Sequence, residues 1–171
     1  MAEMLETERL RLIPLGPEHV EPHVAYLSSE RSHYVGGNKP RDDAWRTVAM
    51  LTGHWVLRGC GPWALIQKAT SEMVGLVGPW YPEGWPEREM SWSVYAKVEG
   101  KGYAREAAIA AREHAYNVLG WDTAVSYIDP ENTRSIALAE RLGCQLDPKA
   151  AAPEKGAPIL VYRHPSPEAL R

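Results

Sequence analysis

The residues with the clearest chemical potential form a short glycine-rich stretch, Glu99-Gly100-Lys101-Gly102-Tyr103-Ala104. It stands between an apolar, alternating segment and an alanine-rich segment with helical spacing. Glycines let the backbone turn tightly and approach a ligand closely, and the free N–H groups at a helix start favour an anion. The stretch therefore predicts a loop that holds a phosphate group, although the same pattern also occurs in plain strand-to-helix turns.

Other common kinds of site find less support in the sequence. The glycine loop lacks the third glycine of the G-x-G-x-x-G dinucleotide fingerprint, and there is no Walker motif. Cys60 and Cys144 lie far apart and form no metal-ligand spacing, and the six histidines are scattered. We therefore expect two free thiols, buried or partly buried, and no metal ion.

Alternating strand and helix signals surround the glycine loop and must position it. The expected strands are residues 9–15, 63–67, 73–78, 89–96, 123–128, 144–146 and 159–162. The expected helices are residues 16–27, 42–56, 103–119 and 132–142. The Pro- and Gly-rich residues 79–86 predict a loop. These elements indicate one α/β (α+β) domain over residues 1–171, with loose tails at 1–6 and 165–171.

Composition sets the broad class of the protein. A chain of 171 residues with 44% hydrophobic content can bury one sizeable core. The 19 basic and 22 acidic residues give a net charge of −3, which predicts no broad attraction to nucleic acid or to an anionic membrane. The first six residues lack the apolar core of a signal peptide, and no run reaches the roughly 20 apolar residues of a membrane span. We expect a cytoplasmic protein.

Three segments, taken in order, carry a resemblance to a known family: Glu89 to Val94, Glu99 to Ala107 and Asn132 to Gly143. Together they resemble the GNAT superfamily of N-acetyltransferases, and Leu5 to Leu12 is similar to its ribosomal-protein N-terminal acetyltransferase branch. The resemblance implies a GNAT-like single domain with a mixed, mostly antiparallel sheet. That sheet would have about six or seven strands with a central, splayed parallel pair, flanked by about four helices.

The same resemblance implies acetyl-CoA as cosubstrate, bound in a cleft where the two parallel strands separate. Backbone groups of Val94 and Ala96 would hydrogen-bond the pantetheine arm like an added strand, and Asn132 would contact that arm. The Val94 amide would polarise the thioester carbonyl. The pyrophosphate would rest on backbone amides of the glycine loop and the following helical turn: Gly100, Lys101, Gly102, Tyr103, Ala104 and Arg105.

Two side chains take catalytic roles through the resemblance. Ser135, one helical turn after Asn132, would protonate the departing thiolate. The attacking amine must be uncharged, yet an α-amino group has a pKa of about 7.7 to 8.0 and a lysine about 10.4, so a base is useful. Glu89 would be that base; Glu87, two residues earlier on the same strand face, and a water relay are alternatives.

Glu99 begins the phosphate loop with a negative charge. Its carboxylate would repel a pyrophosphate unless it turned to solvent or paired with Lys97, Lys101 or Arg105. Two functions therefore stand side by side. One is direct transfer of acetyl to a primary amine, of a protein N-terminus or a small molecule, in a ternary complex. The other is a catalytically silent CoA-binding or regulatory module. Either protein would be a monomer or homodimer without nucleic-acid or membrane partners.

Overall fold

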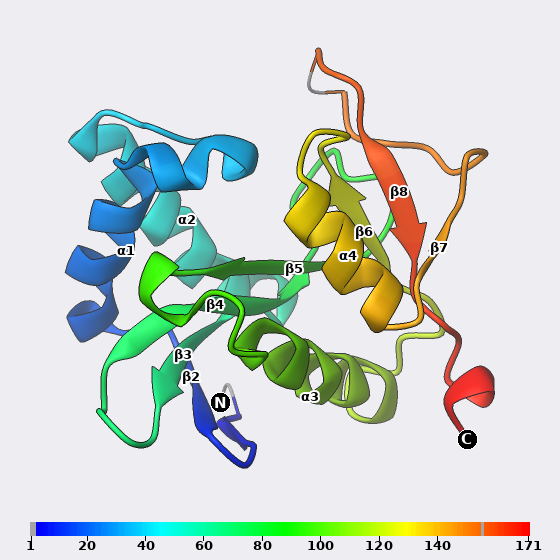
Figure 1. Cartoon of the computed structure of the whole chain (residues 1–171), viewed down its shortest axis with the longest axis horizontal. Coiled ribbons are helices and arrows are strands. Elements are labelled where there is room, and N and C mark those ends of the chain that lie inside the picture. Colours follow the sequence, from blue (N-terminus) through cyan, green and yellow to red (C-terminus); the bar gives the residue numbers. More distant parts are fainter. Residues whose placement is uncertain (1–2, 155) are drawn as a thin grey trace.

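The computed structural model describes residues 3–154 and 156–171, in which one eight-stranded sheet runs through the chain (Figure 1). Its strands are β1 (Leu5–Glu6), β2 (Leu10–Pro14), β3 (Trp63–Gln67), β4 (Met73–Trp80), β5 (Glu89–Val94), β6 (Val125–Ile128), β7 (Gln145–Leu146) and β8 (Leu160–Arg163). The spatial order is β1-β2-β3-β4-β5-β6-β8-β7. Every neighbouring pair is antiparallel except β5 and β6, which are parallel.

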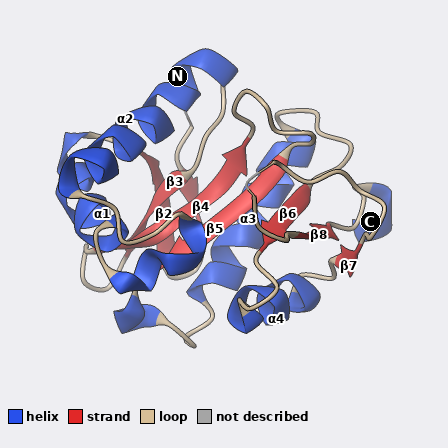
Figure 2. Cartoon of the chain, turned by 90° about the horizontal axis from the view of Figure 1, so that it is seen from above, coloured by secondary structure: helices blue, strands red, loops and turns tan. Residues whose placement is uncertain are grey.

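Helices cover the sheet as Figures 1 and 2 show. The α-helices are α1 (Val20–Leu27), α2 (Arg41–Arg58), α3 (Tyr103–Asn117) and α4 (Thr133–Arg141). Short 3-10 helices are η1 (Pro17–His19), η2 (Glu30–Val35), η3 (Ala96–Val98) and η4 (Glu168–Leu170). Helices α1 and α2 pack against each other, α3 packs against β4 and β5, and α4 contacts β6.

Small side chains explain how closely α3 lies on the sheet. Ala107, Ala108, Ala111 and Ala115 recur on one helix face and are fully buried in the main core cluster. The start of α3 is also tied to the N-terminal strands, because the Glu106 carboxylate accepts hydrogen bonds from three groups of Thr7 and Arg9. The first turn of α3 is thereby fixed beside the end of β5.

The expected fold class is confirmed, with one addition at a sheet edge. The two-residue strand β1 raises the strand number above the expected six or seven, whereas β7 corresponds to the strand expected at residues 144–146. β1 lies in the segment expected to be a loose tail, and its Leu5 pairs with Leu12 of β2. In the other expected tail, η4 forms a single 3-10 turn. Backbone pairing thus extends further towards the N-terminus than the polar sequence indicated.

Strand β4 continues into the segment expected to be a loop. Pro79 and Trp80 pair with Met90 and Glu89 of β5. Trp80 is buried and stacks on His54, with 4.5 Å between ring centroids. Pro79 stands opposite Met90, whose main-chain carbonyl faces β6, so the N–H that proline lacks costs the β4–β5 ladder no hydrogen bond. Burial of Trp80 then overrides the local turn signal.

The parallel pair separates almost as soon as it forms. Its register contains one residue pair, Glu89 with Val125, whereas β4 and β5 are paired from Glu89 through Val94. The expected central, splayed parallel pair is therefore present. One edge of β5 remains without a strand partner after Glu89.

Candidate active site

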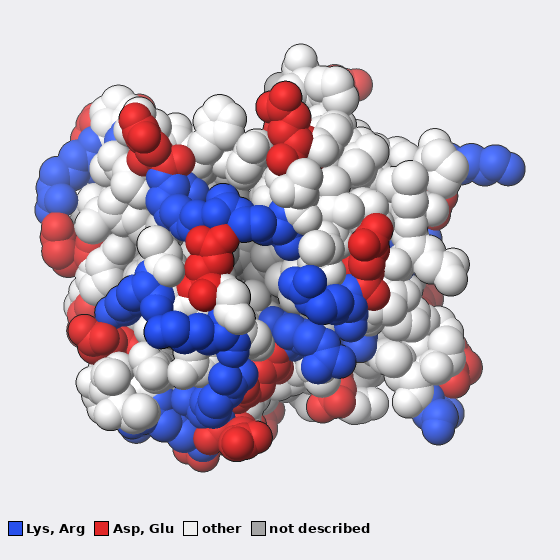
Figure 3. Space-filling view, in the orientation of Figure 1, with Lys and Arg blue, Asp and Glu red and all other residues white. Residues whose placement is uncertain are grey.

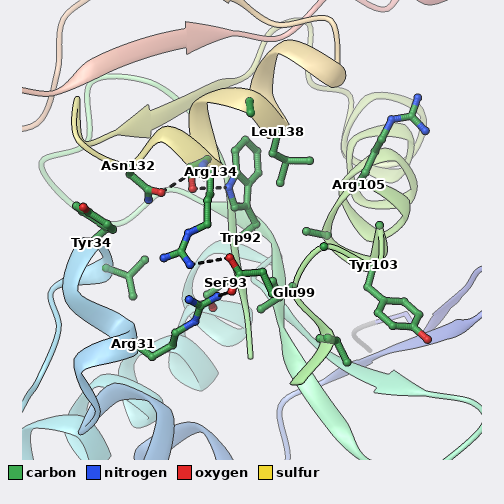
Figure 4. A pocket seen from close by; sticks show the side chains of 18 of the residues that line it. Arg31, Tyr34, Trp92, Ser93, Glu99, Tyr103, Arg105, Asn132, Arg134 and Leu138 are labelled. Carbon is green, nitrogen blue, oxygen red and sulfur yellow. Dashed lines mark hydrogen bonds and ion pairs between the residues drawn. The ribbon is translucent and has the colours of Figure 1, made fainter. Parts of the chain in front are cut away.

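A cavity of about 660 Å³ opens where β5 and β6 separate (Figure 4). The lining comes from the end of β5, the glycine loop with the first turn of α3, helix α4 and η2, with one residue each from α1 and η3. Most of the residues expected to bind the cosubstrate line this cavity: Val94, Gly100, Gly102, Tyr103, Ala104, Arg105 and Asn132. Ser135 lines it as well.

The backbone of β5 points polar groups into the cavity. The Tyr95 N–H donates to the Val74 carbonyl at 2.8 Å, so Tyr95 faces β4. Main-chain groups of successive residues in a strand point to opposite edges. The N–H and C=O groups of Trp92 and Val94 therefore face the cavity, where an extended ligand can pair with them.

The glycine loop has the backbone geometry that its residues favour. Gly100 and Gly102 adopt left-handed conformations with φ of +74° and +82°, and Gly102 is the N-cap of α3. The Lys101 carbonyl accepts a hydrogen bond from Arg9 at 2.9 Å, which holds the loop from behind. The Tyr103 side chain turns into the core and its hydroxyl accepts from Gln67 at 3.0 Å. The Lys101 amide donates to the Val98 carbonyl at 3.3 Å, so the amides presented at the helix start are those from Gly102 onward.

The start of α4 brings Asn132 and Ser135 together. The Asn132 side chain caps the helix, accepting a hydrogen bond from the Ser135 amide at 3.2 Å. The Ser135 hydroxyl accepts a hydrogen bond from the Trp92 indole at 3.2 Å (Figure 4). Because the indole can only donate, the hydroxyl keeps its own proton available to a group in the cavity.

Glu99 points into the cavity between two arginines, as Figure 4 shows. Its carboxylate is ion-paired with Arg31 of η2 and with Arg134 of α4, the latter at 2.6 Å. Partial burial raises the pKa of Glu99, but the two guanidiniums more than offset this and the net pKa is lowered. Pairing was expected with Lys97, Lys101 or Arg105 instead; Lys97 binds Glu72 at 2.9 Å. The negative charge is therefore neutralised locally, and basic side chains border the hollow in Figure 3.

Four expected residues lie away from the cavity lining. Ala96 belongs to η3, where its carbonyl accepts from the Glu99 amide, because β5 ends at Val94. The exposed Lys101 side chain is outside the lining too. Glu89 lies at the opposite end of β5 and accepts a hydrogen bond from the Trp85 indole at 2.6 Å. Glu87 forms a bidentate ion pair with Arg163, at 2.8 and 2.9 Å.

Several cavity residues had not been singled out from the sequence. Arg31 and Tyr34 come from the polar stretch before α2, and Tyr26 comes from α1. Tyr26 stacks on Tyr95 with ring centroids 5.1 Å apart. Trp92 lies in the recognised segment Glu89 to Val94, and Arg134 lies in Asn132 to Gly143. Their neighbours in these segments, rather than the two residues themselves, predicted a place in the site.

Three further observations concern the described residues alone. Cys60 and Cys144 are free, buried thiols, as expected, and burial raises the pKa of Cys144 to about 12. Over residues 3–154 and 156–171, no group of three His, Cys, Asp or Glu side chains could hold a metal ion. Over the same ranges, each helix is too short or too polar to cross a bilayer.

Solved structures share this fold. An acetyltransferase from Agrobacterium tumefaciens is 36% identical, covers 97% of this chain and 96% of its own, and superimposes with a TM-score of 0.91. A GNAT-family acetyltransferase structure from Bordetella pertussis is 27% identical over 95% of this chain and 99% of its own, with a TM-score of 0.80. The fold is thus that of these acetyltransferases.

The family follows from the sequence model that matches the chain. The model described as Acetyltransferase (GNAT) domain matches residues 9–145, and the chain belongs to this family. Among curated proteins, YkkB of Bacillus subtilis is 31% identical over 110 residues, a segment that spans 63% of this chain and 63% of that protein. The resemblance stated from the three sequence segments is confirmed.

Proposed function

We propose that this chain is an enzyme that transfers an acetyl group from acetyl-CoA directly to a primary amine in a ternary complex. One observation carries the proposal: the open edge of β5 leads from the glycine loop to the Ser135 hydroxyl within one cavity. A phosphate-binding end, a strand-like channel and a proton donor thus follow one another in the order that a thioester of CoA requires.

The cavity fits the chemistry of acetyl-CoA. The cleft-facing groups of Trp92 and Val94 match an amide-containing arm, which can pair with a strand edge. The amides of the glycine loop and the start of α3 suit a pyrophosphate. Arg105, Arg134 and Arg141 line the same cavity and add positive charge to a chain of net −3. The binding charge is therefore local.

Two groups act on the reacting thioester in this proposal. The Val94 amide donates a hydrogen bond to the carbonyl oxygen and stabilises the negative charge that develops there. The amine nitrogen attacks the carbonyl carbon, the carbon–sulfur bond breaks, and the sulfur takes its proton from the Ser135 hydroxyl, which regains a proton from water. The hydrogen bond from Trp92 holds the Ser135 oxygen in place as it gives up that proton.

Glu89 is the base that the geometry favours over Glu87. Arg163 holds both oxygens of Glu87 in a bidentate ion pair, which opposes proton uptake by that carboxylate, and Glu89 accepts a hydrogen bond from the Trp85 indole at 2.6 Å. Glu89 lies four residues before Ser93, which lines the cavity, and four residues correspond to about 13 Å along a strand. We propose that the amine proton reaches Glu89 through ordered water.

Calorimetry with acetyl-CoA, followed by an assay of CoA release with a panel of amines, tests the function. The panel should contain peptides with free N-termini, amino acids and polyamines. Binding followed by release with one class of amine supports the enzyme and identifies its acceptor. Binding without release from any amine favours the silent CoA-binding module. No binding at physiological concentrations contradicts both functions.

Two variants test the residue roles. Ser135→Ala should lower kcat by about 100-fold with little change in the KM for acetyl-CoA, because general acid catalysis contributes about that much. Glu89→Gln should lower kcat by at least about tenfold at neutral pH. Thr47→Ala, which removes a helix hydroxyl outside the cavity, is the control. Changes below threefold in either variant would reject the assignments and leave the cosubstrate site standing.

A further inference from the structure

The separation of β5 and β6 begins at one carbonyl group, that of Met90. The Val125 amide donates to the Arg88 carbonyl at 3.0 Å. In a continued parallel ladder, the next such bond would run from the Tyr127 amide to Met90, two residues further along each strand. The register instead stops, and the Met90 carbonyl accepts the Ser126 hydroxyl at 2.6 Å. A side chain thus takes the place of a backbone donor.

The Ser126 hydroxyl is held by a buried chain of hydrogen bonds. Its proton goes to Met90, so it accepts from Nε2 of His164, 3.0 Å away. Nδ1 of His164 then accepts from the Arg112 guanidinium at 3.4 Å. Arg112 also donates to the Leu142 carbonyl at 2.8 Å. A guanidinium can only donate, so Nδ1 of His164 must accept from Arg112; the Ser126 proton is used on Met90, so Nε2 must donate to Ser126. The imidazole is therefore neutral, with its proton on Nε2.

Burial supports that protonation state. Ser126, His164 and Arg112 are all at most 5% exposed. Burial, with Arg112 in addition, lowers the pKa of His164 to about 3. The His164 ring also packs edge-on to Trp92, with centroids 6.2 Å apart, and Trp92 holds Ser135. The buried chain therefore reaches the cavity at both the strand edge and the proton donor.

We propose that Ser126, held by His164 and Arg112, is the prop that keeps β6 away from β5 and so sets the width of the acetyl-CoA cleft. These three are positioning residues, because none of them lines the cavity. A direct backbone bond would draw the strands to the usual spacing of about 4.8 Å, whereas a bond through a side chain holds them further apart. The inference rests on the proposed use of acetyl-CoA.

The first test replaces Ser126 by Ala. Without the hydroxyl, the Tyr127 amide can bind the Met90 carbonyl and close the strands. We expect the Kd for CoA, measured by calorimetry, to rise at least tenfold. The KM for acetyl-CoA should rise in parallel, while the KM for the amine stays within twofold. Independently of any ligand, hydrogen exchange of the Tyr127 amide should slow.

Ser91→Ala is the matched control. Its hydroxyl makes the same kind of bond, to the Gly78 carbonyl at 3.2 Å, but across β4 and β5, where the ladder is continuous. It should change the Kd for CoA by less than twofold. A folded Ser126→Ala protein with the wild-type Kd and wild-type Tyr127 exchange overturns the inference. If the wild type binds no CoA, the proposed function fails, and Tyr127 exchange alone decides about the prop.

Two His164 variants keep the test decisive if Ser126→Ala does not fold. His164→Gln retains an N–H near the position of Nε2, and it should keep the Kd for CoA within threefold of the wild type. His164→Leu removes the donor and should raise that Kd at least fivefold. Equal Kd values for CoA in the two folded variants would refute the proposed role of Ser126, because the two variants differ in whether residue 164 can donate a hydrogen bond to Ser126.

Discussion

The two edges of β5 differ sharply. Towards β4 the strand is paired from Glu89 through Val94, and towards β6 only Glu89 has a partner. The paired edge joins β5 to a sheet covered by the buried alanines of α3. The open edge leaves main-chain groups of Trp92 and Val94 facing a cavity.

This difference separates scaffold from site. A buried backbone group without a partner is costly, so an unpaired strand edge inside a domain needs a reason. Here the reason is a ligand that can act as the missing strand. Residues on the paired edge should therefore affect stability, whereas residues around the open edge should affect binding and turnover.

Low pH should have the largest effect on stability, because one buried histidine lies near the paired edge of β5 and another lies near its open edge. His23 bonds Tyr95 next to β4, and His164 bonds Ser126 of β6. Burial lowers the pKa of both to about 3, so below pH 6.5 the unfolded chain binds more protons and stability falls as pH falls. From pH 7 to 5 we expect a loss of about 2 kcal/mol for each histidine, measured by urea unfolding.

Single variants show how much of this loss of stability comes from each histidine. His23→Gln and His164→Gln should each remove about 2 kcal/mol of the loss between pH 7 and 5. Burial also lowers the pKa of His19 and His114, so these two histidines contribute to the remainder. His33→Gln changes an exposed imidazole on η2 and should leave the pH dependence at its wild-type steepness. A full wild-type loss in both buried variants would show that neither ring is the group that titrates.

A smaller effect should come from the loop at the end of the open edge. Gly102 and Gly120 both have positive φ, +82° and +67°, and both would be strained by Ala at a cost of about 1 to 2 kcal/mol. Gly102→Ala should also raise the Kd for acetyl-CoA about tenfold, because strain there moves the amides that face the phosphates. Gly120→Ala follows α3 at its far end and is the control for strain alone. Equal Kd values for Gly102→Ala and Gly120→Ala would show that the phosphates do not bind at this loop.

The smallest effect is expected from Glu99. Glu99→Gln leaves Arg31 and Arg134 without their shared carboxylate, so acetyl-CoA should bind about threefold tighter at low salt and show little gain at about 1 M salt. Glu113→Gln removes the same charge from an exposed site on α3 and should not change the affinity. Weaker binding by Glu99→Gln would mean that its ion pairs order the cleft more than its charge repels the ligand.

Sequence patterns predicted the features that depend on neighbouring residues. The tight turn at the glycines and the placement of Asn132 and Ser135 at the start of a helix depend on residues close in sequence, so local chemistry specifies them. The splayed strands came from the family resemblance. Pairing of Glu99 with Arg31 could not be read in this way, since 68 positions separate them and only the packing of η2 beside the loop joins them.

The same reason explains the other differences. Trp80 is held in β4 by His54, a residue of α2, and the Pro-rich sequence around it carries no sign of that contact. Ser126, His164 and Arg112 come from β6, the end of β8 and α3. Each has an ordinary sequence context, and their joint role exists only once three distant elements have packed together.

The Ser126 hydroxyl also bears on how such a cleft changes over evolutionary time. A gap made by breaking a backbone ladder is redrawn only when two strands change their register, which needs many coordinated mutations. The width of a gap that one side chain holds open depends on a single codon. Point mutations at this serine can thus vary the donor-binding space while the sheet around it keeps its pattern.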